Sequence, residues 1–343
     1  MRSFSFQSLF LWLVVAASSV TIGYLVATAD NGRAEGQAPA SPRKNTPEST
    51  PAKAPPVRSK LSEIPFDGAA AYEYLKQVCA IGPRPSGSPG MASQQKLLTE
   101  HFAKLGGNVS MQEFRVRHPL TGLQVAMANL IVEWHPDRKE RVLLCAHYDT
   151  RPYPDRDRRR PKGRFIGAND GASGVAVLME MGKHMAALKG PVGVDFVLFD
   201  GEELVYQEGD KYFHGSERFA TTYARAPAEH RYRWGVLLDM VGDKELSIPQ
   251  EGHSVTWPDT RPLVAEIWGI AAKLGVREFV PQVGGQVLDD HIALHDIGKI
   301  PTCDLIDFDY PAWHTEADVP SNCSPLSLAK VGWVIHEWLK GQK

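Results

Sequence analysis

The chain has 343 residues, 43% of them hydrophobic and 23% charged, and a formal net charge of −2. This composition is typical of a globular protein and excludes a fibrous or wholly disordered one. The near-neutral balance gives no reason to expect nucleic-acid binding, which usually needs a basic face. The densest basic run, residues 155–164, also contains Asp155 and Asp157, and this mixture favours a solvated loop.

The N-terminus carries an uncharged stretch from Ser8 to Ala29 that is long enough to cross a bilayer as a helix. Its last residues, Ala27-Thr28-Ala29, resemble a signal-peptidase site. Residues 1–29 are therefore predicted to be a membrane anchor or a cleaved signal. In both cases the protein is membrane-anchored or secreted, and the rest of the chain lies outside the cytoplasm.

The next segment, residues 30–60, is rich in Pro, Ala, Ser and Lys and has almost no large apolar side chains. Such a segment buries too little surface to offset chain entropy, so a disordered linker is predicted. The folded domain is predicted to span residues 61–343. The four cysteines are too few and too scattered for a disulfide framework or a structural zinc site, which leaves a single disulfide open.

Helical and strand patterns alternate from Leu61 onward, which is typical of an α/β fold. Apolar periodicity predicts helices at residues 69–79, 90–105, 174–188, 263–274 and 327–339. Strands are predicted at residues 109–116, 127–134, 141–148, 192–199 and 234–240. No phosphate-binding glycine-rich loop and no nucleophile elbow occurs in the sequence. The expected architecture has helices on both faces of a central sheet.

Ionisable side chains stand where the predicted strands end. They are His147, Asp149, Asp170, Glu202, Glu203, Asp239 and His314, the last in a loop after Trp313. Ligand sites in open α/β sheets form beyond the carboxyl ends of the strands, so these groups are expected to converge. Each one has an ordinary explanation on its own, such as a helix cap, a turn or a structural hydrogen bond. Together they suit zinc, which takes imidazole and carboxylate ligands.

At these residues the sequence resembles the zinc aminopeptidase and glutaminyl cyclase family. The segments that carry the resemblance are AHYDT (146–150), GANDGASGVAVLME (167–180), DGEE (200–203), LLDMVGD (237–243), DDH (289–291) and WHT (313–315). IGPRPSGSPG (81–90), DDH and WHT look like the glutaminyl-peptide cyclotransferase branch. The resemblance spans nearly the whole predicted domain and implies a three-layer αβα sandwich with a mixed, mostly parallel sheet.

The resemblance also implies roles for individual residues. Asp170, Glu203 and His314 match the ligands of the catalytic zinc, and Glu202 matches the general acid/base. His147 and Asp239 match the ligands of the second zinc in two-metal aminopeptidases, where Asp170 would bridge. One zinc is expected, and a second stays open. Asp289 or Asp290 matches a carboxylate near the base, and Trp313 matches an aromatic wall of the substrate pocket.

Two departures concern the substrate pocket. Animal cyclases have a histidine where this sequence has Asp304, and a tryptophan shortly after the paired glutamates, where this sequence reads LVYQEG. The zinc residues are unaffected by these differences.

Three hypotheses follow for the function. The first is cyclisation of N-terminal glutamine to pyroglutamate with release of ammonia, with peptide or protein N-termini as partners. The second is a zinc aminopeptidase that hydrolyses N-terminal residues. The third is a non-catalytic binding domain displayed on a membrane, because a fold does not fix a function. A monomer is expected in each case.

Overall fold

The structure is a computed structural model that describes residues 55–225 and 230–343. The predicted anchor or signal, residues 1–29, and nearly all of the predicted linker lie outside the described residues. Within the two described ranges, no helix combines the length and the apolar character needed to cross a membrane.

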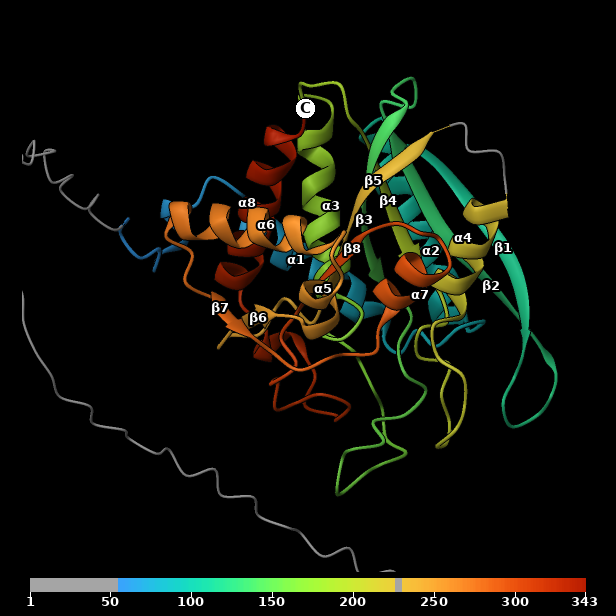
Figure 1. The fold of residues 1–343 in the computed structure, drawn as a ribbon. Coiled ribbons are helices and arrows are strands. Elements are labelled where there is room, and N and C mark those ends of the chain that lie inside the picture. Colours follow the sequence, from blue (N-terminus) through green and yellow to red (C-terminus); the bar gives the residue numbers. More distant parts are fainter. Residues whose placement is uncertain (1–54, 226–229) are drawn as a thin grey trace, which may run out of the picture. The chain divides into compact units, whose positions relative to one another are not determined.

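A six-stranded sheet forms the centre of the domain, in the order β1-β2-β4-β3-β5-β8 (Figure 1). Its strands are β1 (Asn108–Arg117), β2 (Gln124–Trp134), β3 (Glu140–His147), β4 (Gly193–Phe199), β5 (Arg231–Asp239) and β8 (Thr302–Ile306). β3, β4, β5 and β8 are parallel to their neighbours in this group, whereas β2 pairs antiparallel with both β1 and β4. The predicted mixed, mostly parallel sheet is confirmed. A small second sheet pairs β6 (Ile248–Gln250) with β7 (Phe279–Val283).

Helices cover both faces of the sheet. One face carries α1 (Gly68–Ile81), α2 (Pro89–Lys104), α3 (Ser173–Met185), α6 (Arg261–Leu274) and α8 (Pro325–Gly341), whose buried side chains share one hydrophobic cluster. The other face carries α4 (His214–Arg225) and α7 (Asp290–Asp296), which pack in a second cluster. In Figure 1, α6 and α8 lie to the left of the strands and α4 to their right. The short helix α5 (Gly252–Thr256) packs against α6 and β8.

The central strands are mostly apolar because both of their faces are covered, and the buried Arg141 of β3 is paired with Asp195 of β4. In β3, Val142 and Leu144 point into the larger cluster, and Leu143 and Cys145 point into the smaller one. This alternation is the period of two that a strand imposes on its side chains. The buried strands therefore hold in place the polar residues that lie at their carboxyl ends.

The predicted elements agree with the structure to within a few residues at their ends. The sequence analysis missed α4, α7 and β8, and also the short elements β6, α5 and β7. α7 and β8 are only seven and five residues long, too short for a periodic pattern to stand out. α4 follows a loop and has only four buried residues. The single disulfide that the sequence allowed is not present: all four cysteines are free, and all four are buried.

Candidate metal centre

The site lies at one edge of the sheet, where three parallel strands end together. His147 is the last residue of β3 and Asp239 is the last residue of β5, and the strands are direct neighbours. Glu202 and Glu203 follow β4, the neighbour of β3 on its other side. This is the strand-end convergence that the sequence predicts.

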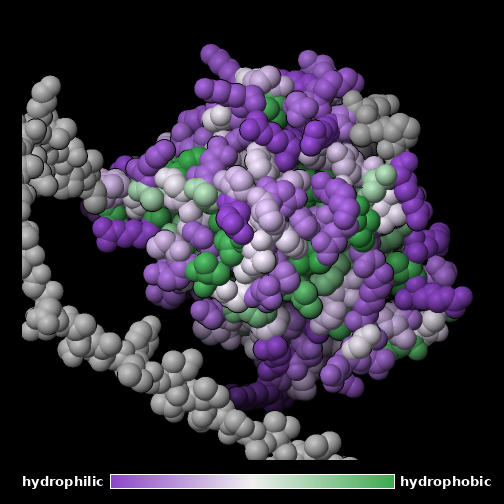
Figure 2. All heavy atoms as spheres, in the orientation of Figure 1, coloured by the Kyte–Doolittle hydropathy of each residue, from purple (hydrophilic) through white to green (hydrophobic). Residues whose placement is uncertain are grey.

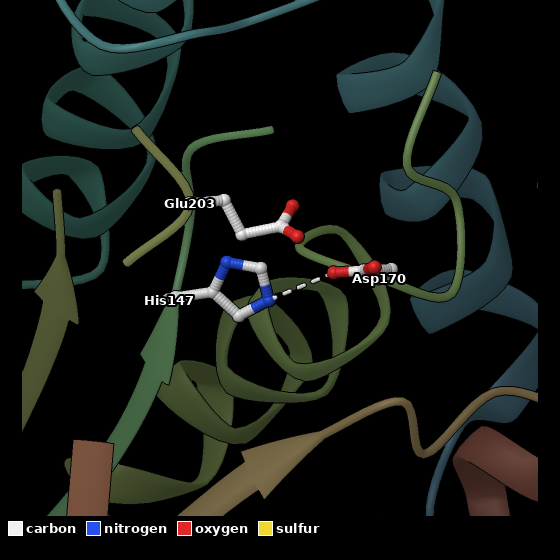
Figure 3. A group of neighbouring side chains, drawn as sticks. All are labelled: His147, Asp170 and Glu203. Atoms are coloured by element: carbon white, nitrogen blue, oxygen red, sulfur yellow. Dashed lines mark ion pairs between the residues drawn. The ribbon is translucent and has the colours of Figure 1, made fainter. Parts of the chain in front are cut away.

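Three buried side chains are close enough to share a metal ion. Donor atoms of His147, Asp170 and Glu203 all lie within 4.8 Å of one another, and the three side chains point toward a common centre (Figure 3). His147 Nε2 is 3.2 Å from Asp170 Oδ1 and 3.2 Å from Asp239 Oδ1. Asp170 comes from the turn that precedes α3, so the site joins a loop to the strand ends.

His314 approaches the same carboxylates from the opposite end of the sequence. Its Nε2 is 2.9 Å from Glu203 Oε1 and 3.5 Å from Asp170 Oδ2. Asp170 therefore faces a histidine with each of its two oxygens, His147 on one side and His314 on the other. Asp170 could therefore share a metal ion with either histidine.

The donor set fits a zinc ion. Ligands of a tetrahedral zinc at its usual bond lengths lie roughly 3.3 Å apart. His314 Nε2 lies at similar distances from Glu203 and Asp170, 2.9 and 3.5 Å. His147 Nδ1 and Asp170 Oδ2 are buried without a hydrogen-bond partner. Burial lowers the pKa of His314, but Glu203, Asp155 and Asp170 outweigh it and raise that pKa to about 9. The surrounding carboxylates therefore favour a cation at this point.

Glu202 stands beside the donors as a candidate proton carrier. Its side chain is 12% exposed, and its Oε2 lies 3.9 Å from His147 Nδ1. Burial raises the pKa of Glu202 well above its usual range; the charge of His147 opposes this shift, and that of Glu203 adds to it. A carboxyl group shifted toward neutrality is suited to accept and return a proton near neutral pH.

Backbone hydrogen bonds fix the two glutamates and Asp170. Asp149 accepts the N–H groups of Glu202 and Glu203 at 3.2 and 3.0 Å. Asp318 accepts the N–H groups of Asn169 and Asp170 at 2.8 and 3.1 Å. Both acceptors are fully buried. They hold the turns that carry the donors, as outer-shell groups commonly do around a metal.

Two backbone positions at the site require unusual conformations. Gly171 has φ 95°, and a Cβ there would lie 2.5 Å from the carbonyl oxygen of Asp149, so only glycine fits. His314 also has a positive φ, 55°, which is uncommon for a residue with a side chain. Strain of this kind often occurs where a side chain must be aimed at a ligand.

Arg151 and Asp155 support the donors, and the sequence analysis did not identify them. Arg151 donates its backbone N–H to Glu203 Oε2 at 2.8 Å, and its guanidinium lies 3.5 Å from Oε1. Asp155 Oδ1 is 3.2 Å from His314 Nδ1 and also accepts from Arg151 Nε at 3.0 Å. The signal was weak, because Asp155 opens the charged run that was predicted to be a solvated loop and Arg151 lies just before it.

Asp289 and Asp290 stand at the start of α7 and act electrostatically on Glu202. Asp289 caps α7 by accepting the N–H of Asp290, and Asp290 accepts a hydrogen bond from Ser216. Burial raises the pKa of both carboxyls, to about 7 for Asp290. Their charges raise the pKa of Glu202 in turn. Their predicted role near the base stays a prediction.

A second buried group, also missed, surrounds Asp304. His291 Nδ1 lies 3.7 Å from Asp304 Oδ2, and His291 Nε2 lies 3.3 Å from Glu251 Oε2. All three side chains are shielded from solvent. Asp304 stands where animal cyclases have a histidine, and here a histidine from the DDH segment approaches it instead.

Trp313 lies next to the metal donors, as the resemblance implies. Its ring centroid is 4.2 Å from that of His314 and 4.7 Å from that of Phe308. The guanidinium carbon of Arg156 lies 3.8 Å from the ring centroid. The position suits a wall beside the site, and the residue's role in substrate binding stays a prediction.

Comparison with known proteins identifies the family. Residues 129–339 match the family described as Peptidase family M28, which is more than half of the chain. The chain belongs to peptidase family M28. This M28 member is 26% identical over 292 residues to bovine glutaminyl-peptide cyclotransferase, an alignment that covers 74% of this chain and 76% of the bovine protein.

Solved structures agree with this family. The M28 chain is 43% identical to Fimbriiglobus ruber glutaminyl cyclase with a TM-score of 0.78, covering 86% of this chain and 100% of that one. A Zn-dependent exopeptidase from Parabacteroides distasonis is 28% identical with a TM-score of 0.75, covering 80% and 98%. The family resemblance and the fold predicted from the sequence are confirmed.

Proposed function

We propose that this M28 member is a zinc-dependent glutaminyl-peptide cyclotransferase, which converts N-terminal glutamine of peptides to pyroglutamate and releases ammonia. The observation that carries the proposal is the partly buried Glu202 carboxyl, 3.9 Å from His147, in the site where His314 meets Asp170 and Glu203. The 43% identity to the Fimbriiglobus ruber glutaminyl cyclase, over the whole of that chain, supports the choice among M28 activities.

Asp170, Glu203 and His314 would hold the catalytic zinc. When bound, zinc supplies a Lewis acid that polarises the γ-amide carbonyl and stabilises negative charge on its oxygen. Asp155 and Arg151 keep His314 and Glu203 oriented toward that position. His147 and Asp239, 3.2 Å apart on the other side of Asp170, would hold a second ion if one is bound.

The reaction itself needs one proton carrier. The α-amine nitrogen attacks the carbonyl carbon of the side-chain amide (Cδ), a carbon–nitrogen bond forms, and the bond from that carbon to the amide nitrogen breaks. Glu202 takes the proton from the attacking amine and delivers it to the departing ammonia. The nucleophile is tethered to its target, so the protein mainly supplies orientation, and Trp313 closes one side of the pocket.

The second candidate is an aminopeptidase, favoured by the pair His147 and Asp239. Two adjacent metal positions that share a carboxylate are suited to activating water for hydrolysis. Glu202 would then take a proton from that water. A structure named as a Zn-dependent exopeptidase is also among the similar proteins, at 28% identity.

Two peptides that differ only in their first residue separate these functions. We expect the zinc-loaded domain to release ammonia from the Gln-initiated peptide, to leave the Leu-initiated peptide intact, and to lose activity with a chelator. Free leucine in place of ammonia would identify an aminopeptidase. Inactivity on both peptides would favour the non-catalytic binding domain.

We also propose that residues 1–29 export the protein and leave the domain membrane-anchored or secreted, outside the cytoplasm, as a monomer. The support is the uncharged stretch of Ser8 to Ala29 in the sequence. Fractionation of cells that express the full chain tests this. A protein found only in the cytoplasmic fraction would contradict the proposal, and size measurement of the purified domain would test the monomer.

A further inference from the structure

The loop between β3 and α3 concentrates positive charge beside the metal centre. Its residues 151–164 include seven basic side chains and two acidic ones, in a chain whose net charge is −2. In Figure 1 this green loop extends at the lower edge of the domain, and Figure 2 shows strongly hydrophilic side chains there. The charge is therefore local and not a property of the whole surface.

The two acidic side chains of the loop are already engaged. Asp155 binds Arg151 and His314, and Asp157 accepts the backbone N–H groups of residues 159, 160 and 316. Glu316, across the loop, pairs with Arg160. Within the described residues, none of the exposed side chains of Arg158, Arg159, Lys162 and Arg164 forms an ion pair. Their charge is available to a ligand.

The loop contacts Trp313 and His314, which lie at the proposed substrate pocket. The backbone N–H of Arg156 donates to the carbonyl oxygen of His314 at 3.1 Å, and its guanidinium lies over Trp313. The backbone N–H of Glu316 donates a hydrogen bond to the Asp157 carboxylate at 3.1 Å. A peptide whose first residue lies beside Trp313 continues outward past this rim, at roughly 3.3 Å per extended residue.

We propose that the basic loop binds acidic side chains of the substrate at about the second to fifth positions, so that the preferred substrates are peptides with Gln followed by Asp or Glu. This inference rests on the proposed function and names its substrate class. An extended acidic segment that passes the exposed basic side chains of the loop is attracted to them.

Three Gln-initiated peptides of equal length test the proposal, with Glu, Ser or Lys at positions two to five. We expect kcat/KM to be roughly 3- to 10-fold higher for the Glu peptide than for the Ser peptide at low salt, and lowest for the Lys peptide. The differences should shrink at about 0.5 M salt because exposed charges are screened. Equal values for the three peptides would overturn the inference.

Charge reversal locates the effect. The double variant Arg158→Glu/Arg159→Glu should lose or invert the preference while its kcat/KM for the Ser peptide stays unchanged. Arg115→Glu/Arg117→Glu, on exposed positions of β1, makes the same change in net charge and should keep the preference. If both variants lose it equally, the net charge is responsible and the loop is not a binding surface.

A binding measurement separates this inference from the proposed function. Fluorescence anisotropy of a labelled acidic peptide should show weaker binding to Arg158→Glu/Arg159→Glu than to the unmodified protein, whether or not the peptide is cyclised. If no Gln peptide turns over but the acidic peptide binds through the loop, only the proposed function fails. If the loop binds anionic vesicles and no peptide preference exists, the loop is a membrane contact and the inference fails.

Discussion

Asp155 Oδ1 lies 3.2 Å from His314 Nδ1, and the same carboxylate binds Arg151, whose backbone N–H holds Glu203. One arginine–aspartate pair thus orients two of the proposed zinc ligands, which come from distant parts of the sequence. With Nδ1 engaged in this way, Nε2 of His314 is the nitrogen left to bind a metal.

Removal of this carboxylate should weaken zinc binding. Asp155→Ala is expected to lower zinc affinity roughly 10- to 100-fold, the usual effect of losing an outer-shell carboxylate. Competition with a chromophoric chelator measures it. Asp157→Ala is the matched control, since Asp157 binds only backbone N–H groups of the same region. Equal affinities in the two variants would mean that Asp155 supports the loop and not the metal.

Glu202→Gln should separate catalysis from metal binding. The amide retains the shape of the side chain but does not carry a proton between the reacting nitrogens, so kcat should fall by roughly 10²- to 10⁴-fold. Zinc content, measured by atomic absorption, should equal that of the unmodified protein. Full turnover with zinc bound would rule out the proposed role of Glu202.

Zinc removal should destabilise the domain. Without the ion, the buried carboxylates of Asp170 and Glu203 and the partly buried one of Asp239 lose the cation that compensates their charges. Free zinc at 1,000 times its Kd should add about 4 kcal/mol to the free energy of unfolding. Thermal unfolding with and without chelator measures the change, and Asp170→Asn should respond much less. A Tm that is independent of zinc in the unmodified protein would argue against a bound ion.

A histidine pair far from the site should make stability depend on pH. The rings of His184 and His336 lie 4.4 Å apart between α3 and α8. Burial, together with His184 and Lys340, lowers the pKa of His336 to about 4. The unfolded state binds a proton near pH 6.5, so between pH 6.5 and pH 4 it binds more protons than the folded state. Stability from this group is therefore present above pH 6.5 and is lost on acidification.

His336→Gln removes that dependence. Between pH 7 and pH 5 the free energy of unfolding should fall less in the variant than in the unmodified protein. Because the pair is partly exposed, we expect the two losses to differ by only about 1 kcal/mol. Urea unfolding at both pH values gives the comparison. Parallel changes in the two proteins would show that the histidine pair does not contribute.

The sequence predicted the central sheet well because its signals are strong and local. β3 and β4 are largely apolar runs, and the polar groups that follow them are easy to see. The convergence of His147 and Asp239 followed from a general property of parallel strands. Short elements such as β8 gave no such signal, because five residues also fit a buried turn of helix.

The outer part of the site was not predictable from local pattern. Arg151 and Asp155 are adjacent in sequence to residues of a solvated run, and only the folded loop brings them to Glu203 and His314. His291 lies in a segment already noted, yet its partner Glu251 is 40 residues away in a region without a recognised motif. Contacts between distant loops depend on packing, which a single sequence does not display.

Anomalous diffraction at the zinc edge, on crystals of the zinc-loaded domain, tests the central claim most directly. The account predicts a strong peak about 2.0–2.2 Å from one oxygen of Asp170, one oxygen of Glu203 and Nε2 of His314, with Glu202 facing the open coordination position. A peak bonded to other side chains, or no peak near Asp170, would contradict it.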